Sequence, residues 1–223
     1  GLDAYTRKPQ LDGKTLKWTD PISTSGDMTV VAPIDQAFAQ EGGMRMVKGN
    51  LGCGIVKVSA VEERFQSIKA PCRIFDSQDS MKAAFDNNEL NQDVVVVVRF
   101  QGPATNGMPE LHKLTPYLGI LQDRGHKVAL VTDGRMSGAS GKVLAAIHVS
   151  PEARKGGQLA KLVDGDVVEI DSHSGVLTAH VDVSEFDKRT PAQAPVDERT
   201  LGRGMFAKLR ALASNAEDGA SII

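Results

Sequence analysis

The sequence has 223 residues, of which 41% are hydrophobic and 24% charged, and its formal net charge is −2. A chain of this length can bury roughly 70% of the surface of its unfolded form, so it can build a large core without disulfides or a structural metal. The weak negative charge argues against a nucleic-acid-binding protein, which usually has a basic face. No apolar run reaches the roughly 20 residues of a membrane span, and the N-terminus does not resemble a signal peptide. We therefore expect a cytoplasmic protein without a nucleic-acid or membrane partner, folded as a single domain over residues 1–223.

The first third of the chain is predicted to contain turns, short strands and one helix. Five glycines within residues 42–54 indicate tight backbone turns rather than helix. Ser77 is a suitable N-cap for a helix that runs to about Asn87. Apolar runs or apolar–polar alternation predict three strands, at residues 29–34, 55–61 and 73–75.

The centre of the chain is predicted to form a β-loop-α-β unit. Five consecutive valines at 94–98 indicate a strand buried on both faces, and residues 127–132 form a second apolar strand. A helix is predicted over residues 109–124, with the proline that begins it in its first turn. Parallel strands end at the same edge of a sheet, where ligands bind in open α/β sheets. The loops that follow the two strands, 99–108 and 133–142, should therefore lie together.

The last third is predicted to be rich in β-structure. A helical turn at 151–154 precedes two alternating segments, 166–171 and 176–183, which indicate a hairpin. Residues 199–214 have the apolar spacing of an amphipathic helix, and a tail follows them.

Glu110 is the first residue that could have a chemical role. It lies in the first turn of the predicted helix, directly after a glycine-containing loop at the ligand edge. A carboxylate there is a natural ligand for a hard cation such as Mg²⁺. An acid in a first turn also stabilises the helix through its dipole, so the position by itself does not distinguish a metal ligand from a structural acid.

The loop Thr132–Lys142 is the second candidate, because its small residues let backbone N–H groups approach an anion. Its spacing does not match a phosphate-binding P-loop, since Met136 replaces the first glycine and Val143 follows the lysine. Ser137 is a candidate nucleophile or base. No Gly-x-Ser-x-Gly elbow surrounds it, however, and a turn with a capping serine would explain the same residues.

The cysteines and histidines give weaker signals. Cys53 and Cys72 are too few to hold an iron–sulfur cluster, which takes three or four thiolates. His148 lies in an apolar run and is predicted to be a core histidine.

Four motifs resemble the C-terminal signatures of the family that contains dihydroxy-acid dehydratase and 6-phosphogluconate dehydratase. They are Gly49-Asn-Leu-Gly52, Gly102-Pro103 with Gly107-Met-Pro-Glu110, Thr132-Asp-Gly-Arg-Met-Ser-Gly138, and His148-Val-Ser-Pro-Glu152. They occur in the family's order, and the similarity extends over nearly the whole chain. The segments 107–113 and 138–142 are similar specifically to the 6-phosphogluconate branch.

This resemblance implies a fold and an activity. The fold is a mixed, β-rich α/β class, a swivelling β/β/α domain with a closed or nearly closed β-barrel flanked by helices. The activity is that of a hydro-lyase, which removes water from a vicinal diol acid to give an enol that tautomerises to a 2-keto acid. In this branch 6-phospho-D-gluconate becomes 2-dehydro-3-deoxy-6-phosphogluconate, in the Entner–Doudoroff pathway.

The resemblance also implies cofactors and partners. An iron–sulfur cluster, expected to be of the 4Fe–4S type, acts as a Lewis acid on the leaving hydroxyl. Its cysteines and most metal ligands belong to an N-terminal domain, and members of the family form homodimers. Cys53 and Cys72 do not match the family's cluster ligands.

Individual residues receive roles by the same similarity. Glu110 corresponds to the family's ligand for a divalent cation, expected to be Mg²⁺, and Ser137 to the serine that, as an alkoxide, takes the proton next to the carboxylate. Arg135, Gly138 and Ser140 are expected to bind the substrate. Some relatives have a hydroxyl residue where Ala139 stands here, so a hydrogen bond from that position is missing or is made by Ser140.

Two other functions remain open at this point. The chain could serve the same chemistry on another sugar acid or on a dihydroxy acid. It could also be a non-catalytic anion-binding domain that uses the glycine-rich loops.

Overall fold

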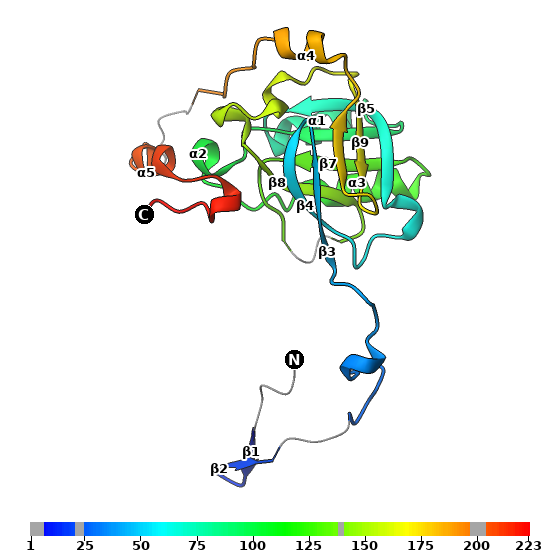
Figure 1. Ribbon diagram of the computed structural model, residues 1–223, viewed down its shortest axis with the longest axis vertical. Helices are drawn as coiled ribbons and strands as arrows, with labels where there is room; N and C mark the ends of the chain where they lie inside the picture. Colours follow the sequence, from blue (N-terminus) through cyan, green and yellow to red (C-terminus); the bar gives the residue numbers. More distant parts are fainter. Residues whose placement is uncertain (1–6, 21–24, 138–140, 197–203) are drawn as a thin grey trace. The chain divides into compact units, whose positions relative to one another are not determined.

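The computed structural model describes residues 7–20, 25–137, 141–196 and 204–223. The chain divides into two compact units, residues 1–42 and residues 43–223, which are described separately (Figure 1). The single domain expected over residues 1–223 stays a prediction.

The first unit contains an antiparallel hairpin of two strands, β1 (Lys8–Asp12) and β2 (Thr15–Thr19). The strand predicted at 29–34 is wrong. The Asp27 carboxylate accepts hydrogen bonds from the backbone N of Thr29 at 2.8 Å and from its hydroxyl at 2.6 Å, which turns the chain where the strand should begin. A single 3₁₀ turn, Ile34–Gln36, follows.

The second unit is a closed barrel of eight strands in the order β10-β3-β4-β8-β7-β6-β5-β9. The strands are β3 (Met44–Gly49), β4 (Gly52–Lys57), β5 (Ser67–Phe75), β6 (Val94–Val98), β7 (Val128–Thr132), β8 (Leu144–Ser150), β9 (Val167–Asp171) and β10 (Val176–Ala179). Strands β5 to β8 run parallel, whereas β3–β4, β4–β8, β5–β9 and β9–β10 pair antiparallel. The predicted mixed, β-rich class with a closed barrel is therefore confirmed.

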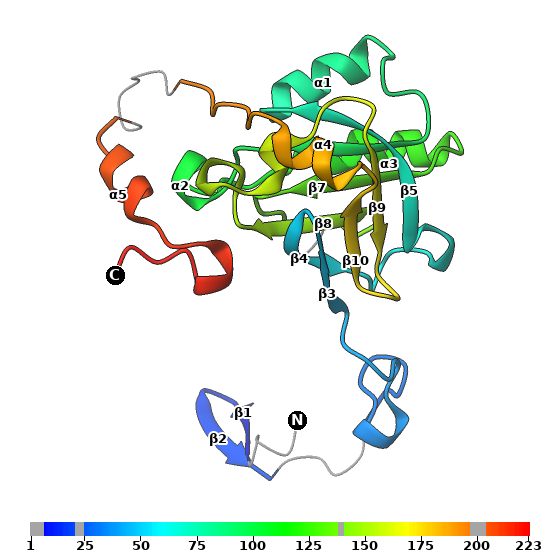
Figure 2. The same cartoon turned by 45° about the horizontal axis from the view of Figure 1, so that its top comes forward.

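Five α-helices are described, and the two longest cover one side of the barrel. They are α1 (Gln78–Asp86), α2 (Pro103–Asn106), α3 (Leu114–Asp123), α4 (Val183–Lys188) and α5 (Ala207–Leu212). Helices α1 and α3 contact each other, and Figure 2 shows both on the outside of the barrel. The predicted N-cap of α1 is confirmed, because the Ser77 side chain accepts a hydrogen bond from the backbone N of Ser80.

Two hydrophobic cores lie on opposite sides of the barrel wall. Along β6, Val95 and Val97 point into the barrel, whereas Val94, Val96 and Val98 pack outward beneath α1 and α3. The valine run is therefore apolar throughout because it is buried on both faces, as predicted.

The last predicted elements are shorter than expected. The hairpin is confirmed, but β10 ends at Ala179 because Asp182 caps α4, accepting hydrogen bonds from the backbone N of Ser184 and Glu185. Helix α5 covers part of the predicted 199–214, and residues 199–203 of that prediction lie outside the described residues. Strand β8, with its alanines and His148, was not predicted.

The barrel closes at a narrow seam between β3 and β10, which pair in parallel through Val176 and Lys48. Beside this pair, the Asn50 side chain donates to the carbonyl O of Ala179 and accepts from its backbone N, both at 2.8 Å. The Asn50 side-chain amide thus makes the two hydrogen bonds that the backbone of a paired strand residue would otherwise make. A Cβ at Gly49 would lie 2.1 Å from the carbonyl O of Leu177, so only glycine fits there. The Gly49–Gly52 motif is explained by barrel closure.

Helix α3 should depend on its buried face for stability. Leu118→Ala removes a fully buried side chain from the outer core, and we expect it to lower the free energy of unfolding by about 2–5 kcal/mol. Ile120→Ala, on the exposed side of the same helix, should cost less than about 1 kcal/mol. Urea denaturation followed by circular dichroism measures both values. Equal losses would contradict the assignment of the helix faces.

Candidate active site

The candidate site lies where β6 and β7 end, at one edge of the barrel. The two strands are parallel, so the loops that follow them leave the same edge, as predicted. The loops pair directly, because Glu110 and Arg135 form an isolated parallel bridge and the backbone N of Leu111 donates to the carbonyl O of Arg135 at 3.1 Å. The structure thus brings together two residues that lie 25 positions apart.

The helical position predicted for Glu110 is wrong. Helix α3 begins at Leu114, so Glu110 lies in the extended loop before it. The cause is twofold: Leu111 is fully buried in the outer core, and its backbone pairs with the loop after β7. Pro116, rather than Pro109, occupies the first turn of the helix, where the missing N–H has no cost. Glu110 is therefore not a helix-dipole acid.

Glu110 and Arg135 form an ion pair that leaves one carboxylate oxygen unused. Arg135 Nη1 lies 2.5 Å from Glu110 Oε2, and Arg135 Nε donates to the carbonyl O of Met108 at 2.9 Å. Glu110 Oε1 is buried and has no hydrogen-bond partner among the described residues. A buried carboxylate oxygen without a donor is costly, and a cation would satisfy it.

Ser137 is exposed at the same edge, two residues after Arg135. Between them, Met136 points into the outer core and anchors the loop. Arg135 and Ser137 therefore both face outward from an anchored segment. The predicted substrate-binding residues Gly138 and Ser140 lie outside the described residues.

Asp133, a fully buried carboxylate directly after β7, holds the loops of the site in place. Its Oδ1 accepts from the backbone N of Gln101 at 2.8 Å, and its Oδ2 accepts from those of Phe100 at 3.1 Å and Ala153 at 3.0 Å. Burial raises the pKa of Asp133 to about 6, although the three N–H donors oppose the rise. Three chain segments are therefore joined at one side chain.

Glu152 is a second buried carboxylate, and it caps helix α2 from a distance. Its Oε1 accepts from the backbone N of Ala104 at 3.0 Å, and its Oε2 accepts from the backbone N and the hydroxyl of Thr105, both at 3.4 Å. The N-cap residue Gly102 has no side chain to do this. A Cβ at Gly102 would lie 2.0 Å from Glu152 Oε2, so the Gly102-Pro103 motif leaves room for this carboxylate.

Sequence reasoning did not single out Asp133 or Glu152, although both lie inside motifs that it quoted. For Asp133, the available signal was an acid that directly follows a mostly apolar, buried strand. Such an acid is buried and must find hydrogen-bond donors.

His148 is half-buried rather than a core residue, and it adopts a left-handed backbone with φ of 56°. Its backbone N donates to the carbonyl O of Gly134 at 2.9 Å, which ties β8 to the site loop. Burial and then the charge of Arg135 lower the pKa of His148, so its ring is neutral at pH 7.

The cysteines do not fit a cluster. Cys72 is buried on β5, and burial, followed by the nearby Asp166 and Asp164, raises the pKa of its thiol to about 12. In the absence of a bound metal its thiol stays protonated. Cys53 lies on β4, which is not a neighbour of β5 in the barrel. The described residues contain no group of three His, Cys, Asp or Glu side chains that could hold a metal ion.

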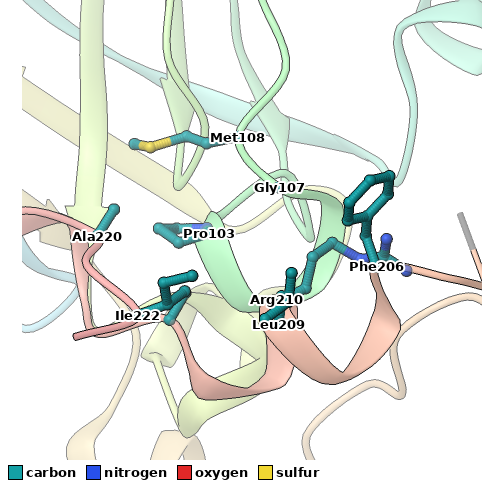
Figure 3. A pocket seen from close by; sticks show the side chains of 9 residues that line it. Pro103, Gly107, Met108, Phe206, Leu209, Arg210, Ala220 and Ile222 are labelled. Atoms are coloured by element: carbon teal, nitrogen blue, oxygen red, sulfur yellow. The ribbon is translucent and has the colours of Figure 1, made fainter. Parts of the chain in front are cut away.

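Beside the site lies an apolar cavity of about 200 Å³ between α2 and α5 (Figure 3). Its lining consists of Pro103, Gly107, Met108, Phe206, Leu209, Arg210, Ala213, Ala220 and Ile222. Only one of these residues, Arg210, is charged, so the cavity does not suit a polyanionic ligand. The polar groups that could bind one lie at the Glu110–Arg135 edge.

Comparison with known proteins shows the family of the chain. The family model described as dihydroxy-acid/6-phosphogluconate dehydratase C-terminal matches residues 29–220. The chain therefore belongs to the dihydroxy-acid/6-phosphogluconate dehydratase family, as the C-terminal part of such a protein.

Several similar relatives within this family are named phosphogluconate dehydratase. The chain is 56% identical to that of Pseudomonas aeruginosa over 99% of its length. It is 52% identical to that of Zymomonas mobilis and 48% identical to that of Escherichia coli K12, each over 100% of the chain. The chain spans only 36–37% of the length of these curated relatives.

The free energy of unfolding of the barrel should depend on pH through the protonation of Asp133. The folded pKa of about 6 exceeds the usual 3.8, so the folded state binds a proton that the unfolded state releases. This contribution to stability is complete below pH 4 and falls by about 3 kcal/mol as the pH rises through 6.

Asp133→Asn should abolish that component. It should also cost about 1–3 kcal/mol at pH 5, because the amide NH₂ cannot accept from the backbone N–H groups. Urea unfolding between pH 4 and pH 7 tests this, with the exposed Asp79→Asn as a control. An unchanged pH dependence in Asp133→Asn would refute the assignment.

Proposed function

We propose that this chain supplies the C-terminal half of the active site of a phosphogluconate dehydratase. The reaction is the dehydration of 6-phospho-D-gluconate to 2-dehydro-3-deoxy-6-phosphogluconate, a step of the Entner–Doudoroff pathway. The observation that carries the proposal is the 48–56% identity, over essentially the whole chain, to relatives of that name. The Glu110–Arg135 edge with Ser137 beside it supports the proposal chemically.

Ser137 is the proposed base. Dehydration removes the proton from the carbon next to the carboxylate and the hydroxyl group from the neighbouring carbon, so that the elements of one water molecule are lost. The resulting enol tautomerises to the 2-keto acid. A serine can accept the proton only as an alkoxide, which needs nearby positive charge. The exposed position of Ser137 on an anchored loop, two residues after Arg135, supports this role.

Glu110 is the proposed ligand of a divalent cation, for which Mg²⁺ suits its carboxylate chemistry. The free, buried Oε1 atom supports the assignment, since Arg135 occupies only Oε2. When bound, such a cation supplies positive charge that stabilises an alkoxide and an enolate. Glu110 supplies one ligand, and the described residues contain no group of three His, Cys, Asp or Glu side chains that could complete the site.

Arg135 is the proposed anion-binding residue of the substrate site. Its guanidinium group is anchored by the Met108 carbonyl and by Glu110, and it remains partly exposed. An anchored guanidinium binds a carboxylate or a phosphate with two parallel hydrogen bonds. Gly138 and Ser140 are proposed to bind substrate on the resemblance alone.

The half-site requires a partner, which we identify as the N-terminal portion of the full-length protein. Its support is that the chain spans 36–37% of its relatives' length. The proposed 4Fe–4S cluster belongs to that portion, because Cys53 and Cys72 do not fit it. We further propose that the full-length protein is a homodimer in the cytoplasm.

No helix in the described part of the chain is long and apolar enough to cross a membrane.

Ser137→Ala should abolish turnover without weakening substrate binding. In the full-length protein we expect kcat to fall by about 10²–10⁴-fold, because the base is lost, while KM changes little. Anaerobic assay of 2-keto acid formation from 6-phosphogluconate measures both. Normal turnover in Ser137→Ala would support a non-catalytic anion-binding domain. Equal activity on gluconate or a dihydroxy acid would point to another substrate of the same family.

Glu110→Gln should weaken cation binding. The amide retains the shape of the side chain but loses the charge, so the dissociation constant for Mg²⁺ should rise roughly tenfold or more in the full-length protein. Isothermal titration calorimetry measures it, and Glu62→Gln, an exposed acid paired with Arg64, is the matched control. If Glu110→Gln and Glu62→Gln bind Mg²⁺ equally well, Glu110 is not a ligand.

A further inference from the structure

The β1–β2 hairpin has one wholly apolar face and one wholly polar face. Its register places Leu11 opposite Leu16 and Pro9 opposite Trp18. Side chains alternate along each strand, so these residues share one face. The opposite face consists of Lys8, Gln10, Asp12, Thr15, Lys17 and Thr19. Lys17 and Asp12 form an ion pair there, as expected of a face turned to water.

Within residues 1–42, no residue that the structure describes covers the apolar face. Leu11 is 72% exposed, Leu16 55% and Trp18 59%. The unit formed by residues 1–42 has no core to receive them, since every buried core residue described lies at Val47 or later. A hairpin of two strands is marginal in water, and so complete a separation of faces indicates that one face is buried in the working protein.

The comparisons indicate where the hairpin belongs. The C-terminal family model begins at residue 29 and leaves the hairpin outside. The full-length relatives nevertheless match 99–100% of the chain, including the hairpin, and are much longer than it. The hairpin thus belongs to the long protein but precedes its C-terminal domain.

We propose that the apolar face, Pro9, Leu11, Leu16 and Trp18, packs against an apolar patch on the N-terminal portion of the same polypeptide. The polar face remains in water. The hairpin then fastens the two halves of the protein together. This inference rests on the N-terminal portion named in the proposed function, but it does not depend on the reaction.

Trp18, the single tryptophan of the chain, reports directly on this packing. Hydroxyl-radical footprinting with mass spectrometry compares its oxidation rate in the full-length protein and in the chain 1–223. We expect Trp18 to be oxidised rapidly in the chain and several-fold more slowly in the full-length protein. Equal oxidation rates in the two proteins would overturn the proposal.

A pair of adjacent substitutions separates the two faces. Leu16→Lys places a charge on the apolar face, whereas Thr15→Lys places the same side chain on the polar face of the same strand. In the full-length protein we expect Leu16→Lys to lower Tm by roughly 3 °C or more and Thr15→Lys to leave it unchanged. Equal shifts would contradict the proposal.

Two further measurements identify any other occupant. In the chain 1–223, Leu16→Lys should not change the unfolding of the barrel, and a lowered barrel Tm would show that the hairpin docks on residues 43–223 instead. In the full-length protein, light scattering should give Leu16→Lys the same mass as the unsubstituted protein. Conversion to a smaller species would assign the face to a second copy. None of these readouts requires turnover, so they stand whether or not the proposed reaction is correct.

Discussion

The site depends on one buried carboxylate. Asp133 lies at the end of a strand with no described cation beside it, and it accepts three backbone N–H groups from two other segments. Each of those groups would be an unsatisfied donor without it, which would cost about as much as a lost hydrogen bond. The loop that leads to Glu110 and the segment that follows Glu152 are therefore fixed relative to Arg135 and Ser137 by hydrogen bonds rather than by packing alone. This arrangement explains how glycine-rich loops can hold a definite geometry.

The motifs that resemble the family's signatures have different structural roles in this arrangement. The Gly49–Gly52 motif closes the barrel, and Gly102-Pro103 makes room for the carboxylate that caps α2. Among the described residues of these loops, Arg135 and Ser137 are exposed at the strand ends, and Glu110 pairs with Arg135 beside them. Most of these motif residues thus support the positions of a few. The exposure of Arg135 and Ser137 and the unused oxygen of Glu110 would suit the proposed half-site.

Sequence reasoning succeeded where local pattern and burial agree. The runs at 94–98 and 128–132 are strands because their two faces meet two different cores, and Ser77 caps a helix by a contact with its own first turn. Sequence reasoning failed where contacts between residues distant in the chain determine the structure. Pro109 and Pro116 are equally suitable for a first turn, and only the burial of Leu111 selects the second. The partners of Asp133 lie 20 to 33 positions away in the chain, so the sequence contains the acid but not its donors.

The seam between β3 and β10 gives the barrel an uneven resistance to opening. Elsewhere the strands are joined by ladders of several residues, but here one backbone pair and the Asn50 amide close the ring. A fluctuation that separates β3 from β10 needs to break only a few hydrogen bonds. Separating β6 from β7 would also disrupt the two hydrophobic cores between which these strands lie. Amide protons of β10 should thus exchange with solvent through local opening, and those of β6 only when the whole barrel unfolds. The barrel is therefore a rolled sheet closed by a few hydrogen bonds at one seam, rather than a ring of equal strength all round.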